Sequence, residues 1–213
     1  MEEQNIFEIN QNVVVQTQSL VDSKVYIIDN FYRYPEKVLN FFLSMPPKIH
    51  KKNEKPSYNQ VYFDDRRHRL KSDKISHVYR FLSSLCNQKS VLGDDSIVTN
   101  FTRFKISAFN DYKQNYWWPH IDEGYTGILY LSDDTTSGTN LYNVLTYTED
   151  YNTNEHYKPW RSKKDYQILI SLESKFNRMV LFDALKFCHG MNICNQKYFS
   201  DEYRINQVFF FTE

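Results

Sequence analysis

From residue 97 onward, the sequence is a succession of short apolar or alternating segments separated by turn residues. Residues 97–106 alternate between apolar and polar side chains as a half-buried strand does. Five more segments of strand length follow, at 127–131, 139–144, 166–172, 178–182 and 204–211. The separators carry turn-forming residues, such as Asp133-Asp134 and Ser137-Gly138. Many short strands in one run predict a β-sandwich or a β-barrel.

The first 95 residues show a different pattern, with one short strand and two helices. Residues 25–28 are an apolar run of strand type, whereas residues 35–44 carry apolar side chains at helical spacing behind Pro35. A second helix is predicted over about 72–87. Residues 1–20 are interpreted as a polar lead-in. Residues 48–71 are interpreted as a solvated loop or edge, with a substrate-facing basic patch as the alternative.

A chain of 213 residues is long enough for one substantial domain. We therefore expect a single domain over 1–213, in which about 1–95 supports a β core over about 96–213. The polar stretch of about 145–164 is predicted to be an inserted loop, and a long loop at that place could act as a lid.

Composition argues against several partners and locations. Basic and acidic residues balance at 26 each, so net charge gives no indication of nucleic-acid or membrane binding. The N-terminal residues are polar and acidic, unlike a signal peptide. No apolar run approaches the roughly 20 residues of a membrane span, and the three cysteines form no CxxC. We expect a cytoplasmic protein without a membrane partner and without nucleic acid.

The segment Pro119-His120-Ile121-Asp122 carries the clearest chemical signal. Residues two apart on a strand point to the same face, so His120 and Asp122 would converge on one point. An apolar strand over 178–182 runs into a turn and then His189, which offers a third ligand. Two histidines and one carboxylate form the facial triad of non-haem Fe(II) oxygenases, which leaves positions open for an oxo acid and O₂.

Arg204 is the second chemical candidate. It begins an apolar C-terminal strand, and a lone cation in that place requires a partner. A 2-oxo diacid that chelates a metal leaves its distal carboxylate inside the pocket. The guanidinium group matches a carboxylate with a bidentate fork, so Arg204 is predicted to hold it.

These motifs together resemble those of the 2-oxoglutarate/Fe(II)-dependent dioxygenases, in particular the prolyl-hydroxylase-like branch. The resemblance covers about residues 97–213. The matching segments are His120-Ile121-Asp122, Ile128-Leu129-Tyr130-Leu131-Ser132, Ser137-Gly138-Thr139-Asn140-Leu141, and Asn177-Arg178-Met179-Val180-Leu181-Phe182 up to His189.

The resemblance implies a double-stranded β-helix, or jelly roll, with the N-terminal helices packed outside it. It implies that His120, Asp122 and His189 bind Fe(II) as the catalytic metal, that Arg204 pairs with the distal carboxylate of 2-oxoglutarate, and that the Tyr130 hydroxyl helps to hold that carboxylate. The implied reaction is hydroxylation of a C–H bond by O₂, with release of succinate and CO₂. A peptidyl residue such as proline is the first expected substrate and a small molecule the second.

Three features depart from the family pattern. His189 and Arg204 are fifteen positions apart, which requires a longer turn, and Ser137-Gly138 replaces a Gly-Gly turn. The loop at 145–164 is longer than in compact members. The nucleic-acid dealkylase branch usually has a second arginine six positions after the first, where this chain has Phe210.

Two other classes remain as alternatives: a non-catalytic metal-binding jelly-roll module, and a cupin-type metal hydrolase or isomerase. A non-catalytic module would be expected to have lost one of the four residues His120, Asp122, His189 and Arg204, and the hydrolase or isomerase leaves Arg204 without a role. The sequence contains no GxGxxG, P-loop, HExxH or GxSxG motif. We expect Cys188 and Trp117 to be packing residues. The remaining histidines, at positions 50, 68, 77 and 156, are interpreted as structural or exposed.

Overall fold

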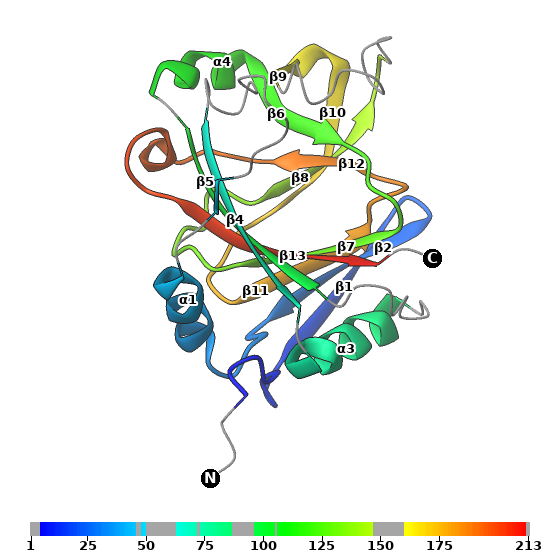
Figure 1. Ribbon diagram of the computed structural model, residues 1–213. Coiled ribbons are helices and arrows are strands. Elements are labelled where there is room, and N and C mark those ends of the chain that lie inside the picture. Colours follow the sequence, from blue (N-terminus) through cyan, green and yellow to red (C-terminus); the bar gives the residue numbers. More distant parts are fainter. Residues whose placement is uncertain are drawn as a thin grey trace.

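The computed structural model describes residues 5–45, 48–49, 63–71, 73–86, 96–104, 106–146 and 160–211. This part of the chain is mainly β and forms two antiparallel sheets with flanking helices (Figure 1). The predicted fold class is confirmed at this level. None of the described helices is long and apolar enough to cross a membrane.

The larger sheet has eight strands, and every neighbouring pair is antiparallel. In spatial order they are β1 (Val14–Leu20), β2 (Ser23–Asp29), β11 (Arg178–Asp183), β7 (Tyr125–Tyr130), β13 (Arg204–Phe211), β5 (Ser96–Phe104), β4 (Phe63–Lys71) and β3 (Lys48–Ile49). Strand β13 is therefore central, between β7 and β5, although it is the last strand along the described part of the chain.

The smaller sheet has five strands and lies above the larger one in Figure 1. In spatial order they are β10 (Tyr166–Leu172), β8 (Thr139–Val144), β12 (Cys188–Met191), β6 (Asn115–His120) and β9 (Trp160–Ser162). From β5 onward the chain passes back and forth between the sheets. As a result, segments that are far apart in sequence become neighbours, such as β6 and β12.

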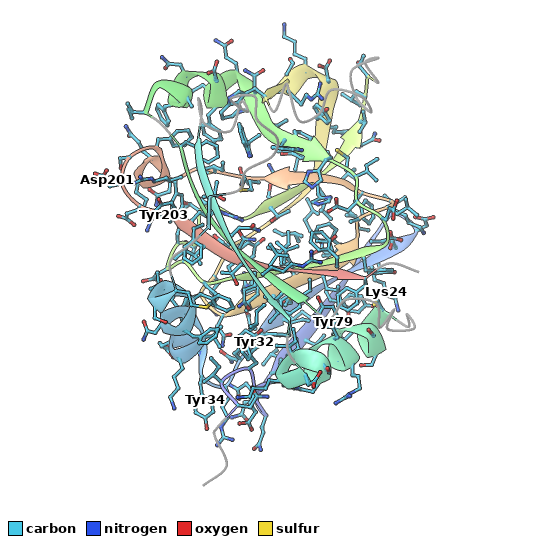
Figure 2. All side chains as sticks on the ribbon, viewed as in Figure 1. Lys24, Tyr32, Tyr34, Tyr79, Asp201 and Tyr203 are labelled. Atoms are coloured by element: carbon cyan, nitrogen blue, oxygen red, sulfur yellow. The ribbon has the colours of Figure 1, made fainter. Side chains whose placement is uncertain are left out.

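Two helices cover the outer face of the larger sheet, α1 (Pro35–Ser44) and α3 (Ser76–Cys86). Pro35 fits the first turn of α1, because its fixed φ and missing N–H cost nothing there. The helices bury their apolar faces against outward-facing strand residues such as Leu129 and Phe209. Tyr32 and Tyr79 lie in this layer between helices and sheet (Figure 2).

The remaining helical segments are short. Helix α4 (Phe109–Gln114) precedes β6 and lies beside the smaller sheet (Figure 1). Four 3₁₀ turns complete the described part of the chain: η1 (Asp73–Ile75), η2 (Ile106–Ala108), η3 (Lys163–Asp165) and η4 (Gln196–Phe199).

A second core lies between the two sheets, and strand alternation decides which side chains enter it. On β7, Ile128 and Tyr130 face this inner core, whereas Leu129 faces the helices. Asn206 pairs with Tyr130 across β7 and β13, so Asn206 and its second neighbour Arg204 also lie on the inner face. The same alternation places His189 on the inner face of β12, next to Leu141 of β8.

Most predicted elements are confirmed with close bounds. The helix over 35–44 and the strands over 139–144, 166–172 and 204–211 coincide with α1, β8, β10 and β13. The second helix begins as η1 and ends at Cys86, close to the predicted 72–87. The strand predicted over 97–106 ends two residues earlier, at Phe104.

Three predictions differ from the structure. The polar lead-in over 1–20 is wrong for residues 14–20, which form β1; its side chains are mostly exposed, so no apolar alternation marks it. Of the solvated loop or edge predicted over 48–71, the loop is wrong for residues 63–71, which form β4, and the edge is confirmed, because β4 and β3 lie at one edge of the larger sheet. The loop predicted over 145–164 contains β9 at its end, and residues 147–159 lie outside the described part of the chain.

Candidate metal centre

His120, Asp122 and His189 come together at the end of the inner core. His189 lies directly opposite His120 in the antiparallel ladder between β12 and β6. The Nε2 atoms of His120 and His189 lie 3.6 and 3.4 Å from Oδ2 of Asp122. One potential ligand atom from each residue lies within 4.8 Å of the other two. The three residues singled out in the sequence therefore form one cluster.

Asp122 reaches this cluster by a different route from the one predicted. Strand β6 ends at His120, so the two residues do not project from one continuous strand. Instead, the backbone N–H of Asp122 donates to the carbonyl of Ala184 at 3.2 Å, and Ala184 donates to Gly124 at 2.8 Å. Gly124 adopts a φ of 76°, which a side chain would disfavour. This pair of backbone bonds fixes the turn that carries Asp122.

A bulge in β6 sets the orientation of the His120 ring. The register between β6 and β12 shifts between the pairs His189–His120 and Met191–Trp117, which leaves one extra residue in β6. Trp118 has a φ of 49° at this place. Its carbonyl oxygen lies 2.7 Å from Nδ1 of His120. A carbonyl oxygen can only accept, so Nδ1 is the protonated nitrogen of His120.

His189 has the same arrangement. Its Nδ1 donates to the carbonyl of Phe187 at 3.3 Å, and its ring packs against Phe182 with the ring centroids 5.0 Å apart. In both imidazoles Nε2 is therefore the nitrogen that lies towards the Asp122 carboxylate. Hydrogen bonds from Nδ1 to the backbone are the usual way in which metal-binding histidines are oriented.

The electrostatics of the cluster favour the protonation states that metal ligands require. Burial alone would raise the pKa of the Asp122 carboxyl, but its interactions with His120 and His189 outweigh this and hold that pKa well below its usual range. Burial and the nearby His120 lower the pKa of His189. At neutral pH the cluster thus offers a carboxylate and a neutral His189 imidazole, the forms that bind a metal.

The donor set fits a divalent transition metal. Ligands about 2.1 Å from a metal lie about 3.0 Å apart at right angles and about 3.4 Å apart at the tetrahedral angle. The separations of 3.4 and 3.6 Å therefore require at most a small contraction. Imidazole and carboxylate in a 2:1 ratio suit Fe(II), Zn(II) or Mn(II). Within the described part of the chain, no other group of three such residues comes together in this way.

Arg204 lies on the inner face with 2 % of its surface exposed. Its Nε donates to the carbonyl of Ser137 at 3.0 Å, its Nη2 to Gly138 at 3.0 Å, and its Nη1 to Oδ1 of Asn206 at 2.9 Å. These bonds use three of five N–H donors and leave one on each terminal nitrogen. Burial lowers the pKa of Arg204, and no carboxylate among the described residues forms a salt bridge with it.

The Ser137–Gly138 turn, whose carbonyls accept from Arg204, packs closely on the end of β10 because Gly138 has no side chain. A Cβ atom at Gly138 would lie 1.8 Å from the carbonyl oxygen of Leu172 and 2.8 Å from the backbone nitrogen of Ser174. No other residue type fits at this position without movement of the backbone. The glycine of the Ser137-Gly138 motif is therefore required by the close packing of the turn on the segment after β10.

Tyr130 lies beside Arg204, as predicted for a residue that helps to hold the same ligand. The Cζ atom of Arg204 lies 5.4 Å from the centre of the Tyr130 ring. The Tyr130 hydroxyl donates to Oγ1 of Thr139 at 2.8 Å. Burial raises the pKa of Tyr130, and the nearby Arg204 opposes this in part, so Tyr130 is a neutral phenol.

Sequence reasoning missed two residues of this group, Thr139 and Asn206. Asn206 follows Arg204 by two positions on a strand, which is a usable signal that the two share a face. Thr139 begins β8 directly after the Ser137–Gly138 turn. Its role as partner of Tyr130 depends on how the two sheets pack, which no local pattern indicates.

The remaining predictions about side chains concern packing. Cys188 points away from the metal cluster into a small core with Tyr142 and Tyr166, as expected. Trp117 is buried in an aromatic cluster with Phe104. His77 contacts the carbonyl of Phe7 and has a structural role. His50 and His156 lie outside the described residues, as does the side chain of His68.

No protein-family model matches the sequence, and no curated protein matches it either. The function is therefore inferred from the residues of the metal cluster and from the group around Arg204.

Proposed function

We propose that this protein is an Fe(II)- and 2-oxoglutarate-dependent dioxygenase that hydroxylates a C–H bond of a peptidyl residue, such as proline, or of a small molecule. The observation that carries the proposal is the pairing of two features on the inner core. His120, Asp122 and His189 form a 2-His-1-carboxylate cluster, and Arg204 is a buried cation without a carboxylate partner among the described residues.

The strand order supports a double-stranded β-helix core for this activity. In the larger sheet, β11, β7, β13 and β5 are neighbours, and in the smaller sheet β10, β8, β12 and β6 are neighbours. Successive strands from β5 to β13 alternate between these two sets, apart from the short β9 and the step from β8 to β10. This alternation is the arrangement expected of a jelly roll. On this proposal, β1, β2, β3 and β4 extend the core at its edges.

In the proposed enzyme, His120, Asp122 and His189 would hold the metal through Nε2, Oδ2 and Nε2. The bound Fe(II) would supply O₂ activation, with one oxygen atom entering succinate and the other entering the hydroxyl group of the product, while CO₂ is released. The protein's contribution is to fix three ligands on one side of the metal. His189 is almost fully buried, whereas the side chains of His120 and Asp122 are 29 and 27 % exposed. The substrate would therefore approach on the side of His120 and Asp122.

Arg204 would hold the distal carboxylate of the oxo acid. A buried guanidinium without a counter-ion is costly, and a carboxylate would offset that cost. The two N–H groups left on Nη1 and Nη2 provide the donors, and the Tyr130 ring lies beside the guanidinium group. The bonds to Ser137 and Gly138 hold the guanidinium plane in place before any ligand arrives. This pre-organisation reduces the entropy that binding would otherwise cost.

The proposal is tested by an anaerobic absorbance titration of the purified protein with Fe(II) and then with 2-oxoglutarate. We expect a charge-transfer band that requires both components and that is lost in His189→Ala. His77→Ala is the matched control. His77 lies in helix α3 on the outer side of the larger sheet, where it contacts the carbonyl of Phe7. This variant should keep the band.

The alternative classes give different results in the same experiment. A metal hydrolase, an isomerase or a non-catalytic metal-binding module would bind a divalent metal without a response to 2-oxoglutarate. Metal binding without the band in the wild-type protein would therefore contradict the proposed function while leaving the metal centre in place.

A further inference from the structure

Thr126 is a buried threonine whose hydroxyl has no hydrogen-bond partner within the described part of the chain. Its side chain is 1 % exposed, and Oγ1 is fully covered. A buried hydroxyl without a partner destabilises the folded state, because it has lost its hydrogen bonds to water. Valine has almost the same shape and would avoid this cost. A threonine at this position therefore requires an explanation outside packing.

The register of β7 places Thr126 next to the metal cluster. Thr126 alternates with Ile128 and Tyr130, so it shares their inner face. It lies directly opposite Phe182 of β11. The Phe182 ring in turn packs on the ring of His189, with the centroids 5.0 Å apart. Directly opposed side chains on antiparallel strands have Cβ atoms about 5 Å apart. Thr126 therefore neighbours Phe182, the residue that packs on His189.

The chain connection leads to the same position. Thr126 follows Asp122 by four residues, across the turn that is fixed by Gly124 and Ala184. On its other side Thr126 pairs with Phe210 of β13, which is 46 % exposed although it lies on the inner face. Three neighbouring side chains on β11, β7 and β13 thus connect the metal cluster to solvent: Phe182, which packs on His189, then Thr126, then the partly exposed Phe210.

Two other buried threonines of these sheets, Thr99 and Thr139, have partners. Oγ1 of Thr99, which is fully buried on the outer face of β5, accepts from Gln207 at 3.4 Å. Oγ1 of Thr139 accepts from Tyr130. Thr126 differs from both, because its hydroxyl has no such partner and its neighbours on the inner face are the aromatic Phe182, directly opposite on β11, and the aliphatic Ile128.

We propose that the Thr126 hydroxyl donates a hydrogen bond to the 2-oxo-carboxylate end of the oxo acid when that end is held at His120, Asp122 and His189. This inference rests on the proposed function. An oxo diacid carries a carboxylate at each end, and Arg204 with Tyr130 would take the distal one. Strand β7 carries Tyr130 at one end of its inner face and Thr126 at the other, so a polar group lies at each end of the proposed ligand.

Thr126→Val tests the inference because it removes the hydroxyl and keeps the shape. We expect the melting temperature of the metal-free protein to rise by about 2–4 °C, since an unpartnered buried hydroxyl is lost. The Kd for Mn(II) or Fe(II) should stay within about twofold of wild type. In the presence of the metal, the Kd for 2-oxoglutarate should rise about tenfold or more, because a hydrogen bond to a charged group is lost. Thr126→Ser should restore the affinity.

Thr99→Val is the matched control, with the same substitution at a fully buried position whose hydroxyl accepts from Gln207. It should lower the melting temperature and leave the Kd for 2-oxoglutarate unchanged. If wild type binds 2-oxoglutarate and Thr126→Val binds it equally well, the role of Thr126 is overturned and the proposed function stands. If wild type binds the metal but no 2-oxoglutarate, both proposals are overturned together.

Discussion

His120 and His189 face each other across the ladder between β6 and β12, and their ring centroids are 4.3 Å apart. Each ring donates through Nδ1 to a backbone carbonyl two residues earlier in its own chain segment, Trp118 for one and Phe187 for the other. The backbone thus fixes both imidazoles before a metal binds. A rigid, pre-oriented pair of this kind favours affinity, because little side-chain entropy remains to be lost.

The first prediction concerns His189 and its neighbour Cys188, which point to opposite faces of β12. His189→Ala should weaken metal binding by at least about a hundredfold, because one of three protein ligands is lost. Cys188→Ala removes a side chain from the core with Tyr142 and Tyr166, so it should lower stability and leave metal affinity unchanged. Isothermal titration with Mn(II) measures both affinities. Equal affinity of the two variants would remove His189 from the ligand set.

The second prediction separates metal binding from anion binding at Arg204. Arg204→Lys keeps a positive charge but replaces the planar fork by a single ammonium group. We expect the Kd for 2-oxoglutarate, measured with the metal present, to rise about tenfold or more. Metal affinity should be unchanged. Lysine cannot make all of the hydrogen bonds that Arg204 donates to Ser137, Gly138 and Asn206. A circular dichroism melt of the metal-free variant is therefore needed to show that it is folded. A folded Arg204→Lys with wild-type 2-oxoglutarate affinity would contradict the role of Arg204.

The sequence predicted the metal ligands by residue type and order but not by the route that brings them together. Alternation on a strand was the expected reason for the convergence of His120 and Asp122. In the structure β6 ends at His120, and the backbone bond to Ala184 places Asp122. That bond joins residues more than sixty positions apart, and local pattern carries no information about it.

Strand prediction succeeded where one face is buried and failed where none is. Most side chains of strands β8 and β13 are buried, and the bounds of both strands were predicted correctly. Strand β1 is exposed along almost its whole length and is held by its ladder with β2, so hydrophobic periodicity cannot reveal it. Strand β9 has three residues, of which the buried one is Arg161, and it therefore has no apolar signal.

The third prediction concerns Gly138, which allows the turn that accepts from Arg204 to pack closely on the end of β10. Gly138→Ala would place a Cβ atom 1.8 Å from the carbonyl oxygen of Leu172. The backbone must move, and we expect a loss of about 3 kcal/mol or more in the free energy of unfolding. At Gly127 a Cβ would meet the flexible Sδ of Met179 at 3.2 Å, so Gly127→Ala is the matched control and should cost much less. Urea unfolding of the two variants compares them, and similar losses would contradict the close approach.

The fourth prediction concerns the ion pair that joins β2 to β11, Asp29 with Arg178. The two pairs Nε–Oδ1 and Nη2–Oδ2 are 2.7 and 3.1 Å apart, and the Asp29 and Arg178 side chains are 17 and 15 % exposed. The hydrogen bond from Arg178 is the main cause that lowers the pKa of Asp29, and burial opposes it. Asp29→Asn should therefore reduce the free energy of unfolding at pH 7 by about 1 kcal/mol.

The sign of the pH dependence follows from the lowered pKa. The stabilisation is fully present above the unfolded-state pKa of about 3.9. It is lost as the pH falls through the lower pKa of the folded state, because the protonated carboxyl no longer pairs with Arg178. Wild type and Asp29→Asn should therefore differ in urea midpoint at pH 7 and at pH 5, and converge as the pH falls through the lowered folded-state pKa of Asp29. A difference that persisted undiminished at the lowest pH would mean that hydrogen bonding of Asp29 in its neutral form, rather than the charge, joins these two strands.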